Sequence, residues 1–205
     1  MIRFMAQKRL DGGAPRFRIL VVCTGNICRS PAGELLLRRE LDDSVAVSSA
    51  GTRGMPAWPV SEPMAALLLA DGVPGEQLTA FHSEFLTEPM VAAADLIIAM
   101  SAAHRSQVLE LDPLALRRTF TLGELSRLAA RDDIGRAIDF SNDDDDAARM
   151  ARLVMLANAA RRLARGGASD DVPDPYGRGA EEYAESYRQI KGHIGAVMAA
   201  VRALE

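Results

Sequence analysis

Short apolar runs alternate along the chain with longer stretches in which apolar residues recur every three or four positions. The apolar runs suit strands buried on both faces of a parallel sheet. They are RFRILVVC (16–23), VAVSSAG (45–51), ADLIIAM (94–100) and RRTFTL (117–122). Strands and helices in regular alternation predict a doubly wound α/β sheet with right-handed crossovers. In such sheets ligands bind beyond the carboxyl ends of the strands.

The stretches with helical spacing begin and end at residues that favour helix termini. We expect Ser30 to be the N-cap and Pro31 the first helical residue after the first strand. Ser61 opens a second helix, for which Gly72 is the candidate stop. The predicted helices cover residues 31–41, 61–72, 101–111 and 180–204. The last has an apolar face made of Tyr183, Tyr187, Ile190, Ile194 and Val197.

Composition adds limits to this picture. The chain has 205 residues, is 48% hydrophobic and carries a formal net charge of −4, so we expect one globular domain and neither nucleic acid nor a membrane as a partner. Residues 1–16 contain Gly12, Gly13 and Pro15 and lack the apolar core of a signal peptide. We therefore predict a flexible N-terminal extension over 1–16, a domain over 17–205, and a cytoplasmic location. The oligomeric state is left open.

One charged segment breaks the alternation and predicts a helical insertion at about residues 131–170. Its acidic cluster, Asp143 to Asp146, precedes a helix that carries Arg149, Arg152, Arg161, Arg162 and Arg165. Acids before a helix and bases near its end suit the helix dipole, which indicates a solvated helix with a charged cap. A metal site in the aspartates and a docking surface for a partner are the alternatives.

The loop after the first strand, CTGNICRS (23–30), contains the only two cysteines of the chain. Gly25 and Asn26 tolerate positive φ, so the turn can direct several backbone N–H groups into one concavity. The helix that follows adds its free N–H groups, and Arg29 can bring its guanidinium to the far side of a bound anion. This field favours the thiolate form of Cys23, which is then a nucleophile for phosphorus. A buried Cys and a chance Cys-x5-Arg spacing are the alternative reading.

Several motifs together resemble the low-molecular-weight protein tyrosine phosphatase family. VCTGNICRSP (22–31) is similar to its signature and VPDPYG (172–177) to its second catalytic segment, with comparable segments at SSAGT (48–52) and ADLIIAM (94–100). The resemblance implies a four-stranded parallel sheet flanked by helices, with the phosphate-binding loop after the first strand. It also implies hydrolysis of phosphotyrosine in protein substrates, and of small aryl phosphates, without a cofactor or a metal.

The resemblance also implies roles for individual residues. Cys23 would attack phosphorus and hold a phosphocysteine, while Arg29 would clamp the equatorial oxygens. Ser30 would hydrogen-bond the thiolate, and Asn26 would hold the strained turn. The remaining substrate-binding residues of the loop, which would supply mainly backbone N–H groups, are Thr24, Gly25, Ile27 and Cys28.

Asp174 is the expected general acid and base, and Tyr176 an aromatic wall of the cleft. A phenolate leaving group has a pKa of about 10, so a proton donor accelerates its departure by about 10²- to 10⁴-fold. Pro173 and Pro175 restrict the backbone on both sides of Asp174 and can fix its direction. A simple turn of this composition is the alternative. Gly177 replaces a second aromatic residue that many family members carry.

Cys28 is open to two interpretations. It is either a backbone donor whose side chain only packs, or a resolving thiol that forms a reversible disulfide with Cys23 under oxidation.

Some residues depart from the family pattern. Phe81 and Glu84 stand where a histidine and an arginine are common, and Ser101 where an acid is common. The histidines at 82, 104 and 193 are interpreted as surface or packing residues, because no metal-ligand spacing accompanies them.

Three competing functions are weighed against the phosphatase. Arsenate reductase chemistry needs further cysteines downstream of Cys28, which the sequence lacks. A catalytically silent phosphotyrosine-binding module would not need Cys23, Arg29 and Asp174 together. A redox sensor would need neither the arginine nor the aspartate. The phosphatase is therefore the function that the sequence predicts.

Overall fold

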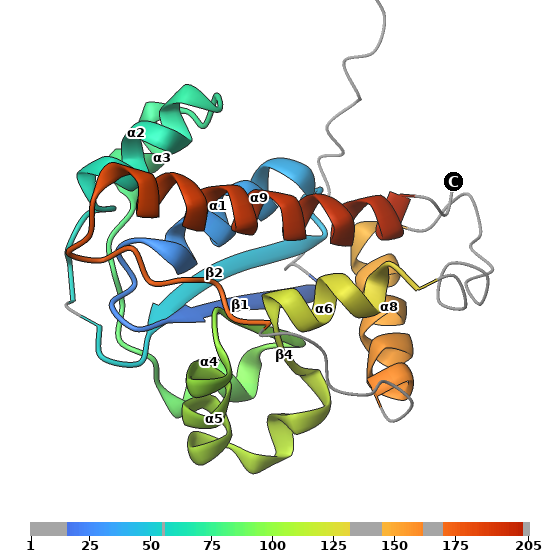
Figure 1. The fold of residues 1–205 in the computed structure, drawn as a ribbon. Helices are drawn as coiled ribbons and strands as arrows, with labels where there is room; N and C mark the ends of the chain where they lie inside the picture. Colours follow the sequence, from blue (N-terminus) through green and yellow to red (C-terminus); the bar gives the residue numbers. More distant parts are fainter. Residues whose placement is uncertain (1–15, 55, 132–144, 162–169, 203–205) are drawn as a thin grey trace, which may run out of the picture.

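A computed structural model describes residues 16–54, 56–131, 145–161 and 170–202 of the chain (Figure 1). The predicted extension over 1–16 lies, apart from Arg16, outside the described residues.

The described residues contain one sheet of four parallel strands in the order β2-β1-β3-β4. The strands are β1 (Phe17–Cys23), β2 (Val45–Gly51), β3 (Leu96–Ala99) and β4 (Thr119–Thr121). The predicted four-stranded parallel sheet is confirmed. The fourth strand is shorter than the pattern 117–122 indicated, because Arg117 and Arg118 end a 3-10 helix, Pro113–Arg118, and Leu122 begins a helix.

Helices cover both faces of the sheet. They are α1 (Arg29–Glu40), α2 (Glu62–Ala70), α3 (Gly75–Ala80), α4 (Glu88–Ala93), α5 (Ala102–Leu111), α6 (Leu122–Ala129), α8 (Asp146–Arg161) and α9 (Ala180–Arg202). In Figure 1, α1 and α9 lie above the sheet and α4 and α5 below it.

The central strand β1 alternates its side chains between two cores. Ile19 and Val21 join the larger core under α1, α6 and α9, whereas Leu20 and Val22 join the smaller core over α4 and α5. Cys23 has the same parity as Ile19 and Val21 and belongs to the larger core. The residue predicted to be the nucleophile thus ends a strand that is buried on both sides.

The predicted start of α1 is wrong. The helix begins at Arg29 with Cys28 as the N-cap, and no side chain caps it. The Ser30 hydroxyl does not cap because it contacts the Cys23 thiol and accepts from Asn26. Two other predicted helix starts are confirmed, since Ser61 is the N-cap residue of α2 and Ser101 that of α5, although only the Ser101 side chain accepts a capping hydrogen bond.

The C-terminal helix α9 has the predicted amphipathic character. The five residues of its predicted apolar face are all buried, and they pack between α1, α6 and the rest of the larger core. Burying a side chain such as Ile190 or Ile194 contributes about 1.5–3 kcal/mol relative to leaving it exposed. This packing holds the segment before α9 over the carboxyl end of the sheet (Figure 1).

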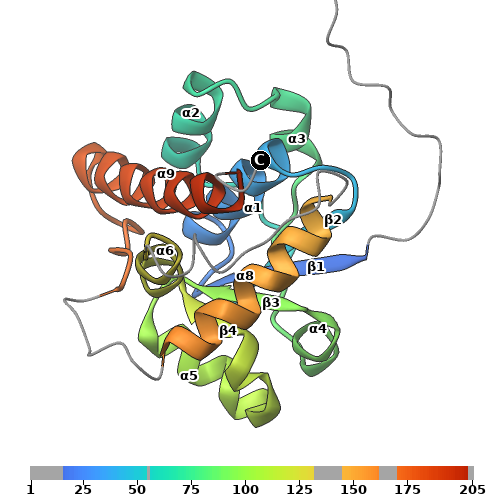
Figure 2. The same ribbon diagram turned by 90° about the vertical axis from the view of Figure 1, so that its right-hand side faces the viewer.

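The charged segment is partly described. Its residues 132–144 and 162–169 lie outside the described part of the chain, and α8 lies between them. α8 buries Met150 and Leu153 against the larger core, and its first turn meets the chain before β2, where Ser44 Oγ accepts the Ala147 N–H at 3.0 Å. Figures 1 and 2 place α8 at the end of the sheet opposite the carboxyl ends of the strands.

Two features are absent from the described part of the chain. No described helix has the length and apolarity needed to cross a membrane. No group of three or more metal-ligating side chains occurs in the described part of the chain.

Candidate active site

The candidate site lies where β1 ends and α1 begins. Cys23 is 2% exposed, and its Sγ lies 3.0 Å from Ser30 Oγ, a hydroxyl in the first turn of α1. Because five residues separate Cys23 from Arg29, the chain between them has to close a tight loop around the helix N-terminus. That N-terminus has free backbone N–H groups and a positive dipole end.

Asn26 holds this loop from inside. Its φ of 55° is in the left-handed region, which asparagine tolerates better than most residues. The fully buried side chain donates to Ser30 Oγ at 2.9 Å and to Ser49 Oγ at 2.7 Å, and its Oδ1 accepts the Glu84 N–H at 2.7 Å. Three hydrogen bonds, two of them buried, therefore support the role that the sequence predicts for Asn26.

The loop carbonyls are bonded to segments outside the loop. Cys23 O accepts the Thr52 N–H, Thr24 O the Arg53 N–H, and Ile27 O the Ser61 N–H, at 2.9, 2.8 and 2.7 Å. These outward carbonyls orient the adjoining peptide N–H groups toward the inside of the loop, as a cradle for an anion requires.

Gly51, at the end of β2, lets the loop pack closely on the sheet. A Cβ at this position would lie 2.7 Å from Thr24 O and 3.0 Å from Asn26 N, both of them backbone atoms. Any larger residue would therefore displace the loop. The close approach explains why a glycine follows the serines and alanine of this strand.

Arg29 reaches under the loop with only 5% of its side chain exposed. Nη2 donates to Asp174 Oδ2 at 2.5 Å and to Thr24 Oγ1 at 3.3 Å, and Nη1 donates to Val172 O at 3.3 Å. Nε is buried and has no hydrogen-bond partner among the described residues. The guanidinium thus joins the loop to the distant segment that carries Asp174.

The segment before α9 is fixed by contacts on both sides of the sheet edge. Asp170 pairs with Arg127 of α6 at 2.7 Å, and Asp171 accepts the Ala102 N–H at the start of α5, also at 2.7 Å. The Val172 N–H donates to Met100 O at 2.9 Å, at the end of β3. These anchors bring Asp174, whose side chain is 49% exposed, over Arg29.

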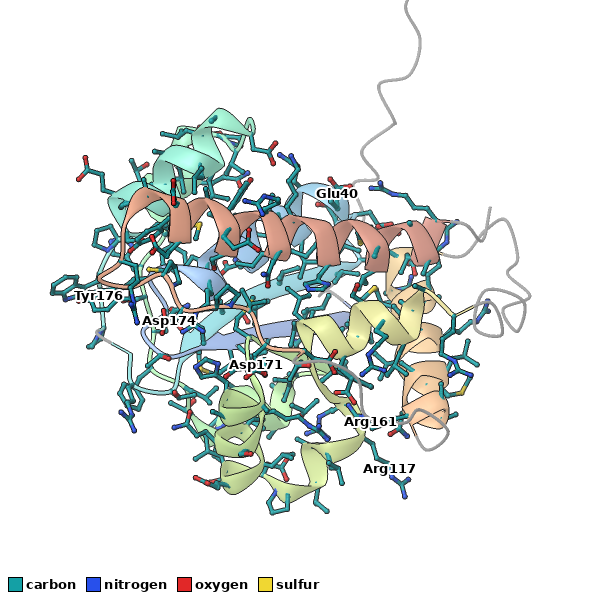
Figure 3. All side chains as sticks on the ribbon, viewed as in Figure 1. Glu40, Arg117, Arg161, Asp171, Asp174 and Tyr176 are labelled. Atoms are coloured by element: carbon teal, nitrogen blue, oxygen red, sulfur yellow. The ribbon has the colours of Figure 1, made fainter. Side chains whose placement is uncertain are left out.

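One pocket of about 240 Å³ brings most of the predicted residues together. It is lined by Cys23, Thr24, Gly25, Ile27, Cys28, Arg29, Arg53, Asp174 and Tyr176. Asn26 and Ser30 belong to the loop but do not line this pocket; their buried side chains bond to each other, and Ser30 also contacts Cys23. Tyr176 is 59% exposed, and Figure 3 shows it projecting outward beside Asp174. Arg53 is an addition to the predicted set, and no motif in the sequence had indicated it.

The Cys28 thiol lies in a small polar cluster beside the pocket. Its Sγ lies 3.1 Å from Ser61 Oγ and 3.5 Å from Tyr183 Oη. Burial raises the pKa of the Cys28 thiol, which favours its protonated form. Both cysteines are free thiols. A disulfide between Cys23 and Cys28 stays a prediction.

The departures from the family pattern fall on residues around this site. Phe81 is buried in the larger core. Glu84 contributes its backbone N–H to Asn26, a contact that does not depend on its side chain. Ser101 caps α5 and contacts His104 Nδ1 at 2.8 Å.

His104 is a second residue, after Arg53, that the sequence analysis did not assign to the site. It is 5% exposed, and its Nε2 lies 2.8 Å from Thr24 Oγ1 in the loop. Its only signal in the sequence is its place three residues after the cap Ser101, which a histidine in any helix could share.

Comparisons with known proteins show what this chain is similar to. A family model described as "Low molecular weight phosphotyrosine protein phosphatase" matches residues 18–137. The Escherichia coli (strain K12) protein named "Low molecular weight protein-tyrosine-phosphatase Etp" is 42% identical over 106 residues, which are 52% of this chain and 69% of that protein.

Solved structures extend the likeness beyond the region that the family model matches. The YwlE arginine phosphatase from Geobacillus stearothermophilus has a TM-score of 0.63 and 25% identity, over 89% of this chain and 90% of that one. The Erwinia amylovora tyrosine phosphatase AmsI has a TM-score of 0.64 and 23% identity, over 93% and 95%; at this identity it shows the fold alone. With more than half of its length matched by the family model, the chain belongs to the low molecular weight phosphotyrosine protein phosphatases.

Proposed function

We propose that this chain hydrolyses phosphotyrosine in proteins through a phosphocysteine on Cys23, with Asp174 as general acid and then general base. The observation that carries the proposal is one pocket that contains the Cys23 thiol, the Arg29 guanidinium and the Asp174 carboxyl group. A nucleophile, an anion clamp and a proton carrier are the three groups that this chemistry needs.

In the first step the Cys23 thiolate attacks phosphorus, and the bond from phosphorus to the phenolic oxygen breaks. Arg29 and the loop N–H groups neutralise the charge on the three equatorial oxygens. The carboxyl group of Asp174 gives its proton to the departing oxygen. Asp174 lies on the exposed side of Arg29, where a leaving group has to depart.

In the second step water attacks the phosphocysteine, and Asp174 takes a proton from that water. The bond between phosphorus and sulfur breaks, and the electron pair returns to Cys23 as a thiolate. The Ser30 hydroxyl, 3.0 Å from Sγ, is placed to donate a hydrogen bond to this thiolate. Phosphate is then released, and the site is restored.

The pocket supports an aryl phosphate as the substrate. Ile27 and Tyr176 contribute apolar surface beside the polar cradle, which suits a flat aromatic ring. Small aryl phosphates share this ring, and we expect them to be hydrolysed too. A phosphoarginine substrate is the second candidate, because the structure of the YwlE arginine phosphatase aligns with 89% of this chain.

The domain limits and the location are also proposals. Contacts of α9 with α1, α6 and α8 support a single phosphatase domain over residues 17–205, with the charged segment as an insertion. A cytoplasmic location stays a prediction, which fractionation of the native host would test.

The test compares a phosphotyrosine peptide with the matched phosphoserine and phosphoarginine peptides, near neutral pH and in EDTA. We expect turnover of the tyrosine peptide, and none for Cys23→Ser. Cys28→Ser is the matched control, because it keeps the backbone N–H and should retain turnover that Cys23→Ser loses. Faster turnover of the arginine peptide would replace tyrosine with arginine as the substrate class.

The general acid has its own test. Asp174→Ala should reduce kcat for the phosphotyrosine peptide by about 10²- to 10⁴-fold. With nitrophenyl phosphate, whose phenol is more acidic and leaves without a proton donor, the reduction should be smaller. An equal reduction for both substrates would remove Asp174 from the role of the acid. Trapping phosphocysteine by rapid acid quench and mass spectrometry would test the intermediate directly.

A further inference from the structure

His104 uses both ring nitrogens to connect α5 with the catalytic loop. Nδ1 lies 2.8 Å from Ser101 Oγ, and Nε2 lies 2.8 Å from Thr24 Oγ1. Thr24 Oγ1 also accepts a hydrogen bond from Arg29 Nη2 at 3.3 Å. Ser101, His104, Thr24 and Arg29 therefore form one continuous chain of side-chain contacts that ends at the anion clamp.

The direction of this chain follows from the chemistry of a neutral imidazole, which has one donor and one acceptor nitrogen. If Nδ1 carries the proton, it donates to Ser101 and Nε2 accepts the Thr24 hydroxyl. If Nε2 carries it, Thr24 accepts from both His104 and Arg29 and keeps its own proton free. In both cases Thr24 Oγ1 is held in place as an acceptor for Arg29.

Thr24 matters because Arg29 has few partners to hold it during the reaction. Its shortest contact is with Asp174, the proposed acid, which has to turn its proton toward the leaving group. Among the contacts that the structure shows, Val172 O and Thr24 Oγ1 are then the two that hold the guanidinium. Val172 belongs to the same segment as Asp174, so Thr24 is the anchor on the side of the loop.

A neutral His104 ring also suits its position beside Arg29. Burial and the neighbouring Arg29 lower its pKa to about 4, against the opposite effect of Asp174 and Asp171. A neutral ring avoids a second cation beside the guanidinium, which would compete with it for the phosphoryl group.

We propose that His104 is a positioning residue for phosphoryl transfer: it holds the Thr24 hydroxyl that anchors Arg29 against the substrate. The proposal rests on the phosphatase function proposed above and adds a residue outside the loop to it. It predicts that the contact at Nε2, rather than the contact at Nδ1, is the one that affects the rate.

Two substitutions separate the two nitrogens. In His104→Gln the longer side chain places an amide near the position of Nε2 and keeps the contact with Thr24. In His104→Asn the amide lies near the position of Nδ1, so the contact with Ser101 is kept and that with Thr24 is lost. Both variants leave a neutral polar side chain in the same buried place, and thermal unfolding will show whether they are matched in stability.

We expect kcat for the phosphotyrosine peptide to be about tenfold lower in His104→Asn than in His104→Gln, the upper range for one buried hydrogen bond. KM should differ by less than kcat, because the clamp is tightest in the transition state. Equal kcat in the two variants, whether both are active or both impaired, would overturn the proposal.

Thr24→Val removes the hydroxyl with little change of shape. Combined with His104→Asn, it gives a double-mutant cycle. The double variant Thr24→Val/His104→Asn should be no slower than Thr24→Val alone, because His104 acts through that hydroxyl. Losses that simply multiply in the double variant would show that His104 acts by another route.

Binding of inorganic phosphate, measured by calorimetry, keeps this test separate from the test of the function. If the wild type fails to turn over any phosphopeptide, the proposed function fails. Even then, His104→Gln should bind phosphate more tightly than His104→Asn, by about threefold or more. Equal phosphate affinities of the two variants would overturn the positioning role whatever the activity.

Discussion

Two largely buried arginines, near opposite ends of the sheet, are bonded very differently. Arg161, in the last turn of α8, donates to both carboxylate oxygens of Glu124 at 2.8 and 3.1 Å and to two backbone carbonyls. Its guanidinium also lies 4.0 Å above the ring of Phe120. Arg29 makes two contacts of 3.3 Å and one short contact with Asp174, and in the described part of the chain its Nε has no acceptor. Figure 3 shows Arg161 and Asp174 far apart.

The difference separates an arginine that serves the fold from one that serves a ligand. A buried guanidinium without acceptors costs free energy, because its N–H groups have lost water without a full replacement. Arg161 has this replacement within the protein. Arg29 keeps donor capacity in a pocket that also holds a thiol, which is the arrangement expected where a substrate supplies the missing acceptors.

The largest expected effect comes from replacing Arg29. We expect Arg29→Lys to lower kcat/KM for a phosphotyrosine peptide by about 10³-fold or more, because a lysine cannot clamp two oxygens in a fork. The free energy of unfolding should change by less than about 1 kcal/mol, since little of the bonding of Arg29 supports the fold. Steady-state kinetics and urea unfolding check both parts. A large loss of stability with a small loss of rate would show that Arg29 supports the fold rather than a bound substrate.

Arg161→Met should show the opposite behaviour. Glu124 would be left in a mostly buried place, where the described residues offer it Arg105 at 3.7 Å and the more distant charge of Arg127. We expect a loss of about 3 kcal/mol in the free energy of unfolding, the lower end for breaking a buried ion pair. The kcat/KM of the folded protein should stay unchanged, because α8 lies away from the site (Figure 2).

A double variant sharpens this prediction. Arg161→Met/Glu124→Gln removes the stranded charge and should recover part of the lost stability, as measured by urea unfolding. If the double variant is less stable than Arg161→Met, the ion pair is not the source of the loss.

The two arginines also differ in how much the sequence could predict. Cys23, Arg29 and Ser30 lie within eight residues, so one loop after one strand brings them together and the motif predicts the site. Arg161 and Glu124 lie 37 residues apart. The charge pattern of the helix predicted its charged end but contained nothing about a partner on α6.

Ser30 and His104 show the same limit of prediction from the sequence, because contacts made in the fold decide their roles. Ser30 has the composition of an N-cap, but the competing contacts of its hydroxyl with Cys23 and Asn26 decided its role. His104 became visible only when the fold placed the first turn of α5 against Thr24. The sheet itself was predictable, because each strand has its own apolar run.

The pH dependence of stability tests whether His104, the neighbour of Arg29, is neutral in the folded chain. His104 has a pKa of about 4 in the folded chain against an ordinary value of 6.5, so the unfolded chain binds this proton more readily between those values. The stability present above pH 6.5 should therefore be lost as the pH falls toward 4, by on the order of 2 kcal/mol. Arg29, Asp174 and Asp171 are the charged groups that face the ring.

His104→Gln is the control for this titration, because it has no proton to gain while all carboxylates stay the same. Urea unfolding of both proteins at a series of pH values should give curves that diverge below pH 6.5. Parallel curves would contradict the assignment of a buried neutral imidazole.

The smallest expected effect changes the partners of Arg29 without changing Arg29. Gly123, near the start of α6, lies directly under Asp170, and a Cβ there would be 2.8 Å from Asp170 O and 3.0 Å from its Cα. Both atoms are backbone, so the segment has to move, and with it Val172 O and Asp174. We expect Gly123→Ala to lower kcat by about tenfold, because small displacements of a catalytic group reduce the rate strongly.

Gly192→Ala, in α9, is the matched control, because nothing lies within 4 Å of its added Cβ. Removing a glycine from a helix should stabilise that variant by about 0.5–1 kcal/mol and leave kcat unchanged. The decisive comparison adds Asp174→Ala to each background. If Gly123→Ala acts by displacing Asp174, removal of the acid will cost less there than in Gly192→Ala. An equal cost in both backgrounds would mean that Asp174 keeps its place, and the slower rate would then come from the contact between Val172 and Arg29.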